Sequence, residues 1–173
     1  MAETSMFADH IAHSPNKFEP QRQHQFLVEI ELDEPTKRLI TLSLMRAFVP
    51  TMTNDEISIP YLNEIVYVAG KYTPTDQNVE IVDYIDEDSQ QLIYNWKTQV
   101  YDPTTGFIGA AASYKKRANI LLLSPDGQKV RTWELLGVWP KSVNFGALEM
   151  GSTDSVKIEM TLRYDKAKYL GRS

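Results

Sequence analysis

The chain has 173 residues, of which 42% are hydrophobic and 24% are charged, and it carries a net charge of −5 at pH 7. These proportions are typical of a soluble globular domain, so neither a disordered chain nor a membrane protein is expected. Because the chain has no cysteine, disulfides, thiolate metal sites and a cysteine nucleophile are excluded, and its acidity argues against nucleic-acid binding by phosphate neutralisation.

The chain is expected to form an N-terminal arm, residues 1–22, and one domain, residues 23–173. In the arm, Phe7 and Ile11 are spaced i, i+4, which is compatible with one or two helical turns. The irregular segment that follows contains Pro15 and Pro20, so the main body begins near residue 23.

Alternating hydrophobic residues predict an antiparallel β domain. The first such segment is 25–32, where Phe26, Val28 and Ile30 share one side, as in a half-buried strand. The other expected strands are 39–48, 63–69, 79–85, 119–123, 130–136 and 155–165, and the expected loops are 50–60 and 102–113. The fold class is therefore mainly β: an antiparallel β-barrel or sandwich of about seven strands with one flanking α-helix.

That helix is predicted over residues 88–101, where Trp96 lies on an apolar stripe of helical spacing. Trp133 and Trp139 are predicted to share a face of the sixth strand. All three tryptophans are interpreted as anchors of the core or of an interface, rather than as platforms for stacked bases.

No arrangement of residues indicates catalysis or a cofactor. The three histidines are His10, His13 and His24, all near the start, and a structural zinc site usually needs four ligands. Gly70 and Lys71 lack the rest of a phosphate-binding loop. We therefore expect no catalytic residue, no cofactor and no metal.

Charge is segregated along the chain. Residues 73–96 contain six acids and no Lys or Arg, whereas Lys115, Lys116, Arg117, Lys129 and Arg131 flank a single Asp126. Either these segments form solvated faces, or they make a self-complementary contact between subunits.

Several segments resemble the tail-tube subunits of contractile phage tails, in the right order and over nearly the whole chain. They are the start at 6–9, the strand at 26–30, the segment 65–71, Tyr114-Lys115-Lys116 with the hairpin after it, the stretch 136–143 with Gly137-Val138-Trp139-Pro140, and the closing strand 156–162. The Gly-Val-Trp-Pro stretch is the most specific of these. The loops 50–60 and 102–113 match no motif of the family.

This resemblance implies a structural subunit of a virion, without enzymatic activity, that is made and assembled in the host bacterial cytoplasm. Subunits would form hexameric rings, which stack into a tube inside a contractile sheath. Further partners would be the baseplate hub or initiator and the tail terminator, while DNA passes through the lumen without specific binding and no membrane is involved. The same fold would serve a contractile injection or type VI secretion device, and a monomeric small-ligand-binding β-barrel is an alternative of another class.

The resemblance also suggests roles for individual residues. Candidates to line the lumen are Glu64, Glu80, Lys157, Glu159, Thr161 and Arg163, and candidates to face the sheath are Gln91, Asn95 and Lys97. Candidates for ring stacking are Phe7, Ile11, Asn54, Asp55 and Glu56. The net charge of −5 motivates the hypothesis that an acidic lumen repels DNA phosphates and lets the genome slide.

Overall fold

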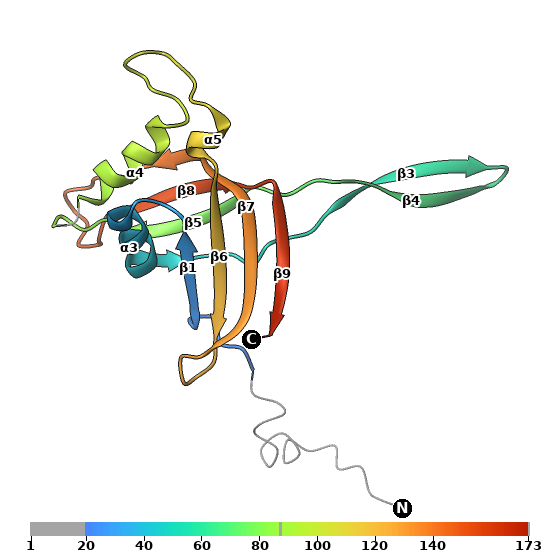
Figure 1. Cartoon of the computed structure of the whole chain (residues 1–173), viewed down its shortest axis with the longest axis horizontal. Helices are drawn as coiled ribbons and strands as arrows, with labels where there is room; N and C mark the ends of the chain where they lie inside the picture. Colours follow the sequence, from blue (N-terminus) through green and yellow to red (C-terminus); the bar gives the residue numbers. More distant parts are fainter. Residues whose placement is uncertain (1–19, 87, 173) are drawn as a thin grey trace, which may run out of the picture.

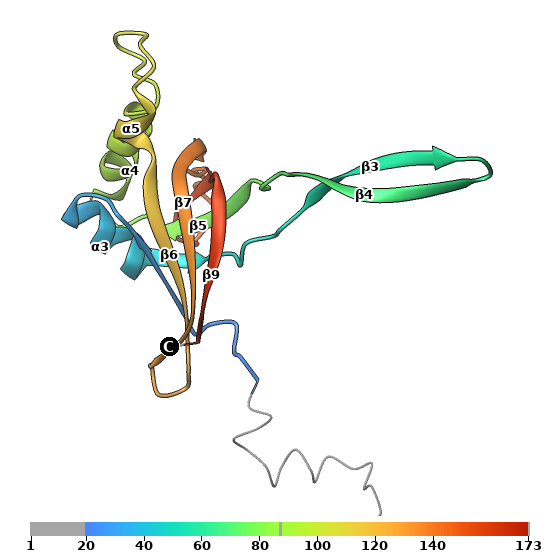
Figure 2. The same ribbon diagram turned by 45° about the vertical axis from the view of Figure 1, so that its right-hand side comes forward.

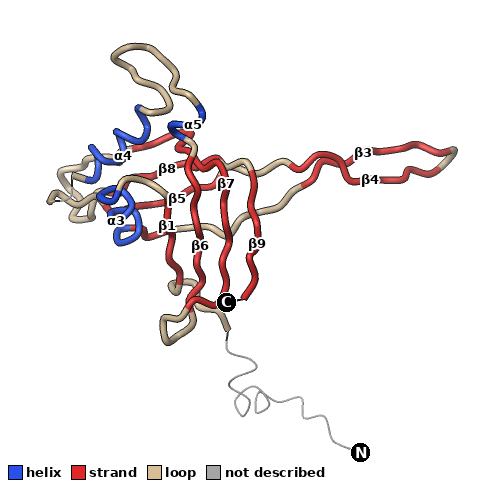
Figure 3. The backbone as a smooth tube through the Cα atoms, viewed as in Figure 1, coloured by secondary structure: helices blue, strands red, loops and turns tan. Residues whose placement is uncertain are grey.

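The computed structural model describes residues 20–86 and 88–172 and shows a mainly β body built from two antiparallel sheets (Figures 1 and 3). The first sheet has the order β1-β6-β7-β9 and the second has the order β7-β8-β5-β2, so that β7 belongs to both. Their bounds are β1 Phe26–Ile30, β2 Leu44–Arg46, β5 Gln77–Val82, β6 Lys116–Leu123, β7 Lys129–Asn144, β8 Lys157–Arg163 and β9 Lys166–Arg172. The predicted mainly β class is confirmed.

The long strand β7 passes from one sheet to the other through a bulge at Gly137. Leu135 pairs with Ala118 and Val138 pairs with Lys116. Between these two pairs, β7 contains one more residue than β6. Gly137 has φ 71°, and a Cβ there would overlap the Asp165 carboxylate, so glycine fits best.

This bulge corrects the prediction for two tryptophans. Leu135 and Val138 are both buried although they are three residues apart, because the extra residue reverses the alternation of side chains. Trp133 therefore packs against the core and Tyr169, whereas Trp139 lies on the other face against Tyr114. They do not share a face.

The core lies between the sheets, where β5 and β8 cross behind β6 and β7 in Figure 1. Its fully buried side chains come from both sheets and from two helices; they include Ile30, Ile40, Ile81, Ile93, Trp96, Ile120, Leu135, Val138, Ile158 and Met160. The role of Trp96 as a core anchor agrees with this packing, since its ring is 2% exposed.

Helix α3, Glu34–Ser43, replaces most of the strand predicted over 39–48, which was wrong except for the three residues of β2. Asp33 caps the helix by accepting hydrogen bonds from the Thr36 amide and hydroxyl. Thr36, Leu39, Ile40 and Ser43 form its buried stripe at helical spacing. Leu42 lies in the middle of the predicted strand, but its side chain is exposed. The alternation of apolar residues in this segment therefore did not indicate the buried face of a strand.

Helix α4, Ser89–Thr98, confirms the helix predicted over 88–101, with Asp88 capping the Gln91 amide. A loop leads from it to the short helix α5, Ala111–Tyr114, within the segment predicted as a loop. In the part of the chain that the structure describes, no helix has the length and apolar character needed to cross a membrane.

Strands β3, Asn54–Tyr61, and β4, Glu64–Tyr72, form a two-stranded hairpin that extends far from the body in two views 45° apart (Figures 1 and 2). The prediction of a loop over 50–60 was therefore wrong for residues 54–60, whereas the strand predicted over 63–69 lies within β4 apart from its first residue. Pro60 is compatible with β3 because the strand is hydrogen-bonded on one side only. β9 was not predicted at all, and β7 is much longer than the predicted strand 130–136.

Candidate functional site: assembly surfaces

The outer face of β5 and β8 is a continuous polar surface opposite the core. Val79, Ile81, Ile158, Met160 and Leu162 point inward, while the residues between them point outward. The outward residues are Asn78, Glu80, Lys157, Glu159, Thr161 and Arg163, together with the half-buried Val82 opposite Lys157. Five of the six predicted lumen residues therefore share one surface, which we call the polar face.

Glu64, the sixth, lies elsewhere. It is the first residue of β4 and sits opposite Tyr61 at the far end of the hairpin. The structure does not bring it together with the other five.

Side chains on the polar face pair with one another. Glu80 and Glu159 stand directly opposite, and Lys157 Nζ lies 2.9 Å from the Glu80 carboxylate. This hydrogen bond, and then the negative charge of Glu80, raises the pKa of Lys157. The Thr161 hydroxyl donates to Asn78 Oδ1 at 3.0 Å, so few groups on this face are left for other ligands.

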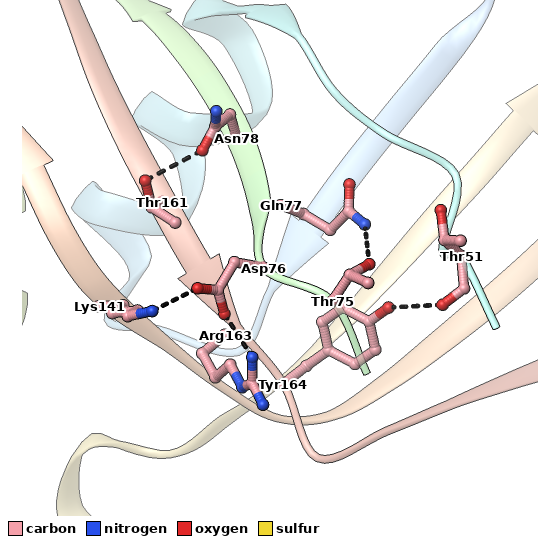
Figure 4. A network of polar contacts seen from close by, with 9 residues as sticks. All are labelled: Thr51, Thr75, Asp76, Gln77, Asn78, Lys141, Thr161, Arg163 and Tyr164. Atoms are coloured by element: carbon pink, nitrogen blue, oxygen red, sulfur yellow. Dashed lines mark hydrogen bonds and ion pairs between the residues drawn. The ribbon is translucent and has the colours of Figure 1, made fainter. Parts of the chain in front are cut away.

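At one end of the polar face, Asp76 accepts from two cations (Figure 4). Lys141 Nζ donates to its Oδ2, and Arg163 Nη1 donates to its Oδ1 at 2.6 Å. The hydrogen bonds from Lys141 and Arg163 lower the pKa of Asp76 below its ordinary value of 3.8. Asp76 thus ties β7 and β8 to the start of β5.

The Asp76 contacts predict a defined pH dependence of stability. Because the folded-state pKa is depressed, the carboxylate stabilises the fold above pH 3.8, and this contribution is lost as the pH falls through the lower folded-state value. Asp76→Asn should therefore lower the unfolding free energy at pH 6 by about 1 kcal/mol, the upper range for an exposed pair. Denaturant titrations at pH 6 and pH 3 should show this difference shrinking, and an unchanged difference would contradict the assignment.

The polar face is not acidic. Asp76, Glu80 and Glu159 are offset by Lys141, Lys157 and Arg163, and Arg46 of β2, directly opposite Glu80, adds a fourth cation. The net charge of −5 of the whole chain is therefore not concentrated on this surface, and the hypothesis of an acidic lining finds no support in it.

The hairpin presents two different faces. Residues directly opposite across an antiparallel pair point the same way, so the register places Ile57, Ile59, Val66 and Val68 together. We call these four residues the aliphatic stripe. Each is between 48% and 54% exposed, although β-branched side chains on a strand are normally covered.

The opposite face of the hairpin is mixed. It carries Glu56, Ser58, Pro60, Ile65 and Tyr67. The aliphatic stripe was missed because residues 50–60, which include β3, were predicted to be a loop, so that the partner of the predicted strand 63–69 was not found. Its signal was the alternation of Ile57 and Ile59 with Glu56 and Ser58.

The predicted stacking residues 54–56 lie at the base of the hairpin. Asn54 Nδ2 donates to the Gly70 carbonyl at 3.4 Å, and Asp55 Oδ2 accepts from the Thr73 hydroxyl at 3.4 Å. Both contacts join β3 to the segment at the end of β4. Phe7 and Ile11 lie outside the described residues, so their role in stacking stays a prediction.

A buried tyrosine fixes the base of the hairpin to the body. Tyr164, after β8, is 1% exposed and stacks on Phe48 with ring centroids 6.3 Å apart. Its hydroxyl donates to the Thr51 carbonyl just before β3 at 3.4 Å (Figure 4), and burial raises its pKa. The direction of the hairpin is therefore set by packing as well as by the chain connections.

The three predicted sheath-facing residues on α4 differ in environment. Gln91 and Asn95 are exposed, and Gln91 Nε2 donates to Asn95 Oδ1 at 2.7 Å. Lys97 instead turns toward β7, where its ammonium donates to the carbonyls of Pro140 at 3.1 Å and Lys141 at 2.8 Å. Burial lowers the pKa of Lys97, so this residue anchors the helix and does not present a free charge.

Within residues 20–86 and 88–172, no cluster of His, Asp and Glu has the arrangement of a metal site. The segment Gly70-Lys71-Tyr72 is the end of β4. Of the three histidines, His10 and His13 lie outside the described residues.

Comparison with known proteins shows which proteins this chain is similar to. No family model matches the chain. The chain is 26% identical over 165 residues to tail tube protein gp19 of Enterobacteria phage T4, a match that covers 92% of this chain and 98% of the phage protein. The chain is a homologue of phage tail tube proteins. Tail tube protein gp19 of Enterobacteria phage T6 matches over the same shares of both chains at 25% identity.

Solved structures of contractile devices have the same fold as this tail tube homologue. A chain of an extracellular contractile injection system, in its extended sheath-tube complex, aligns with TM-score 0.67 at 16% identity and covers 96% of this chain and 99% of its own length. A chain of the anti-feeding prophage baseplate aligns with TM-score 0.66 at 18% identity over 88% of this chain and 96% of its own. The prediction of a structural rather than catalytic protein agrees with the homology to two tail tube proteins.

Proposed function

We propose that the chain is the subunit of the inner tube of a contractile phage tail, and that hexameric rings of it stack into the tube. The observation that carries this proposal is the homology to the T4 tail tube protein over 98% of that protein's length. This homology favours a phage tail over an injection or secretion device, because the solved structures of such devices share only the fold with this chain. The sheath, the baseplate and the tail terminator are the partners of such a tube, and the tail of the virion is its location.

The uncovered hairpin supports self-assembly. An isolated two-stranded hairpin is marginally stable in water, and β3 and β4 pair only with each other. Contact with another copy would cover the aliphatic stripe in every subunit. A chain with this fold occurs in the six-fold symmetrised structure of the anti-feeding prophage baseplate, which supports a ring of six.

The polar face is our candidate for the lumen. It is hydrophilic over two strands, and most of its charges are paired with one another, so a phosphate backbone gains little by binding there. We infer that DNA slides because the charges of the lining are largely paired among themselves, rather than because the lining is strongly acidic.

Reversing the two glutamates of the polar face tests the lumen assignment. Glu80→Lys with Glu159→Lys makes this face strongly basic, so each ring should hold phosphates and slow DNA ejection at low salt. The control reverses Glu29 and Glu34, which lie outside the polar face. Ejection followed by dye fluorescence should slow at least tenfold for the first pair alone, and equal rates would contradict the assignment.

Gln91 and Asn95 remain candidates for contact with the sheath. Replacing both with glutamate is expected to reduce the number of sheathed tubes while bare tubes still form, because both side chains are exposed and support no core contact. Electron microscopy of tube and sheath subunits expressed together would show the result. Normal sheathed tubes would count against this surface.

The ring itself is tested in solution. Size-exclusion chromatography with light scattering should give a species of six times the 19.8-kDa chain, or larger stacks. A monomer that persists at high concentration would refute the proposal and would favour the ligand-binding barrel.

A further inference from the structure

The strands at the two ends of the sheet path leave a gap in the body. The path runs β1-β6-β7-β8-β5-β2, so β1 pairs only with β6 and β2 only with β5. An open groove of about 760 Å³ lies at this gap. Its apolar lining includes Phe26, Leu27, Leu44, Met45, Phe48 and Leu122.

The groove reaches the core of the domain. Val28 and Ile120 belong both to its lining and to the buried core. Met45 and Val49, which also line it, are 55% and 51% exposed. Because apolar surface in contact with water is unfavourable, the groove fits an occupant with apolar side chains.

The described chain begins at the rim of this groove. Gln21 and His24 belong to the lining. Gln21 Nε2 donates to the Leu123 carbonyl at the end of β6 at 2.9 Å, and the Gln25 amide donates to the Arg22 carbonyl at 3.2 Å. These bonds fix the point at which the preceding residues leave the body.

The segment before this point has the chemistry and the length to fill the groove. Residues 1–19 lie outside the described ranges, and on a helix Met6, Phe7 and Ile11 would fall on one side. A helix over residues 5–13 is about 14 Å long, and the five-residue strand β1 is about 16 Å long. The link 14–19 spans up to about 20 Å when extended, so such a helix can fold back along β1.

We propose that residues 5–13 dock as a short amphipathic helix in the groove between β1 and β2 of their own chain, with Phe7 and Ile11 on its apolar floor. A short link to the rim gives the segment an effective concentration of about millimolar at its own groove, which favours its own chain over a second copy. The docked segment covers the open edge of the core in the free subunit. Stacking through Phe7 and Ile11 would then require its release.

Crosslinking within one chain tests the docking, since the natural chain has no cysteine. His10→Cys, which keeps Phe7 and Ile11, is combined with Met45→Cys in the groove, and the dilute protein is treated briefly with a short bis-maleimide crosslinker. The matched control combines His10→Cys with Lys168→Cys, an exposed residue of β9. β9 is three strands from β1, about 14 Å across the sheet, so a segment without a preferred site would reach both positions.

A product within one chain, identified by mass and peptide mapping, is expected for positions 10 and 45 at a rate at least tenfold above that for 10 and 168. Adding Phe7→Glu to the first pair should remove this excess, because a carboxylate is unfavourable in an apolar groove. Equal rates for the two pairs, a product only between chains, or an excess that survives Phe7→Glu would overturn the docking. None of these results bears on the proposed tube, which the mass of the assembled protein tests separately.

Discussion

Replacing Ile57, Ile59, Val66 and Val68 with threonine is expected to abolish tubes while the subunit stays folded. Each of these side chains is about half exposed and none belongs to the core, so the body loses no packing. Threonine keeps the preference for strands but removes an apolar contact, at a cost of about 1 kcal/mol for each partly buried side chain. With four losses in every subunit contact, stacking should fail.

Negative-stain images should then show no tubes, while circular dichroism of the variant retains the β signal. The control changes two other exposed apolar residues, Leu42→Thr and Leu148→Thr, which are 70% and 89% exposed and lie outside the hairpin. Tubes of normal length from the four-residue variant, or an equal loss from the control, would contradict the role of the stripe.

The second large effect concerns the core. Trp96→Ala should lower the free energy of unfolding by about 3–5 kcal/mol, because it leaves a cavity where a ring was fully enclosed. The change also removes the hydrogen bond from the indole Nε1 to the Tyr114 carbonyl at 3.3 Å. Since this bond and the packing join α4 to the segment before β6, the subunit should assemble poorly at 37 °C.

Trp139 provides the matched comparison. It is half-buried and touches Tyr114 edge to face, with ring centroids 5.8 Å apart, so Trp139→Ala should cost about half as much or less. Denaturant unfolding at low protein concentration measures both variants. Equal losses would contradict the assignment of Trp96 to the closed core and of Trp139 to a half-buried position.

The sequence was most informative where a strand has one buried face. The alternation in 25–32 and 155–165 led directly to β1 and β8, because one side of each strand packs on the core and the other meets solvent. The same logic failed at α3, since Ile40 and Leu42 of this helix alternate by chance with Leu44, the first residue of β2. Asp33 as a cap and Pro35 in the first turn were the signals that favoured the helix.

The functional surfaces were harder to predict, for a physical reason. The polar face follows from alternation in β5 and β8, so five of its residues were found together. Strand β3 has no contact with the core to mark it as a strand, and its polar and proline residues are typical of a loop.

The resemblance to tail-tube subunits supplied what local patterns did not. It rested on short motifs such as Gly137-Val138-Trp139-Pro140, and the homology to the phage tail tube proteins confirms it. The structure explains the glycine of this motif, because Gly137 forms the bulge at which β7 passes from one sheet to the other. A conduit has no need of an active site, which agrees with the lack of a catalytic pattern in the sequence.

Cryo-electron microscopy of the purified, assembled chain tests the central claim most directly. We predict stacked rings of six subunits in which the polar face of β5 and β8 lines the lumen and each hairpin contacts another copy. Particles that remain monomeric, or tubes in which a different surface of the subunit faces the axis, would contradict it.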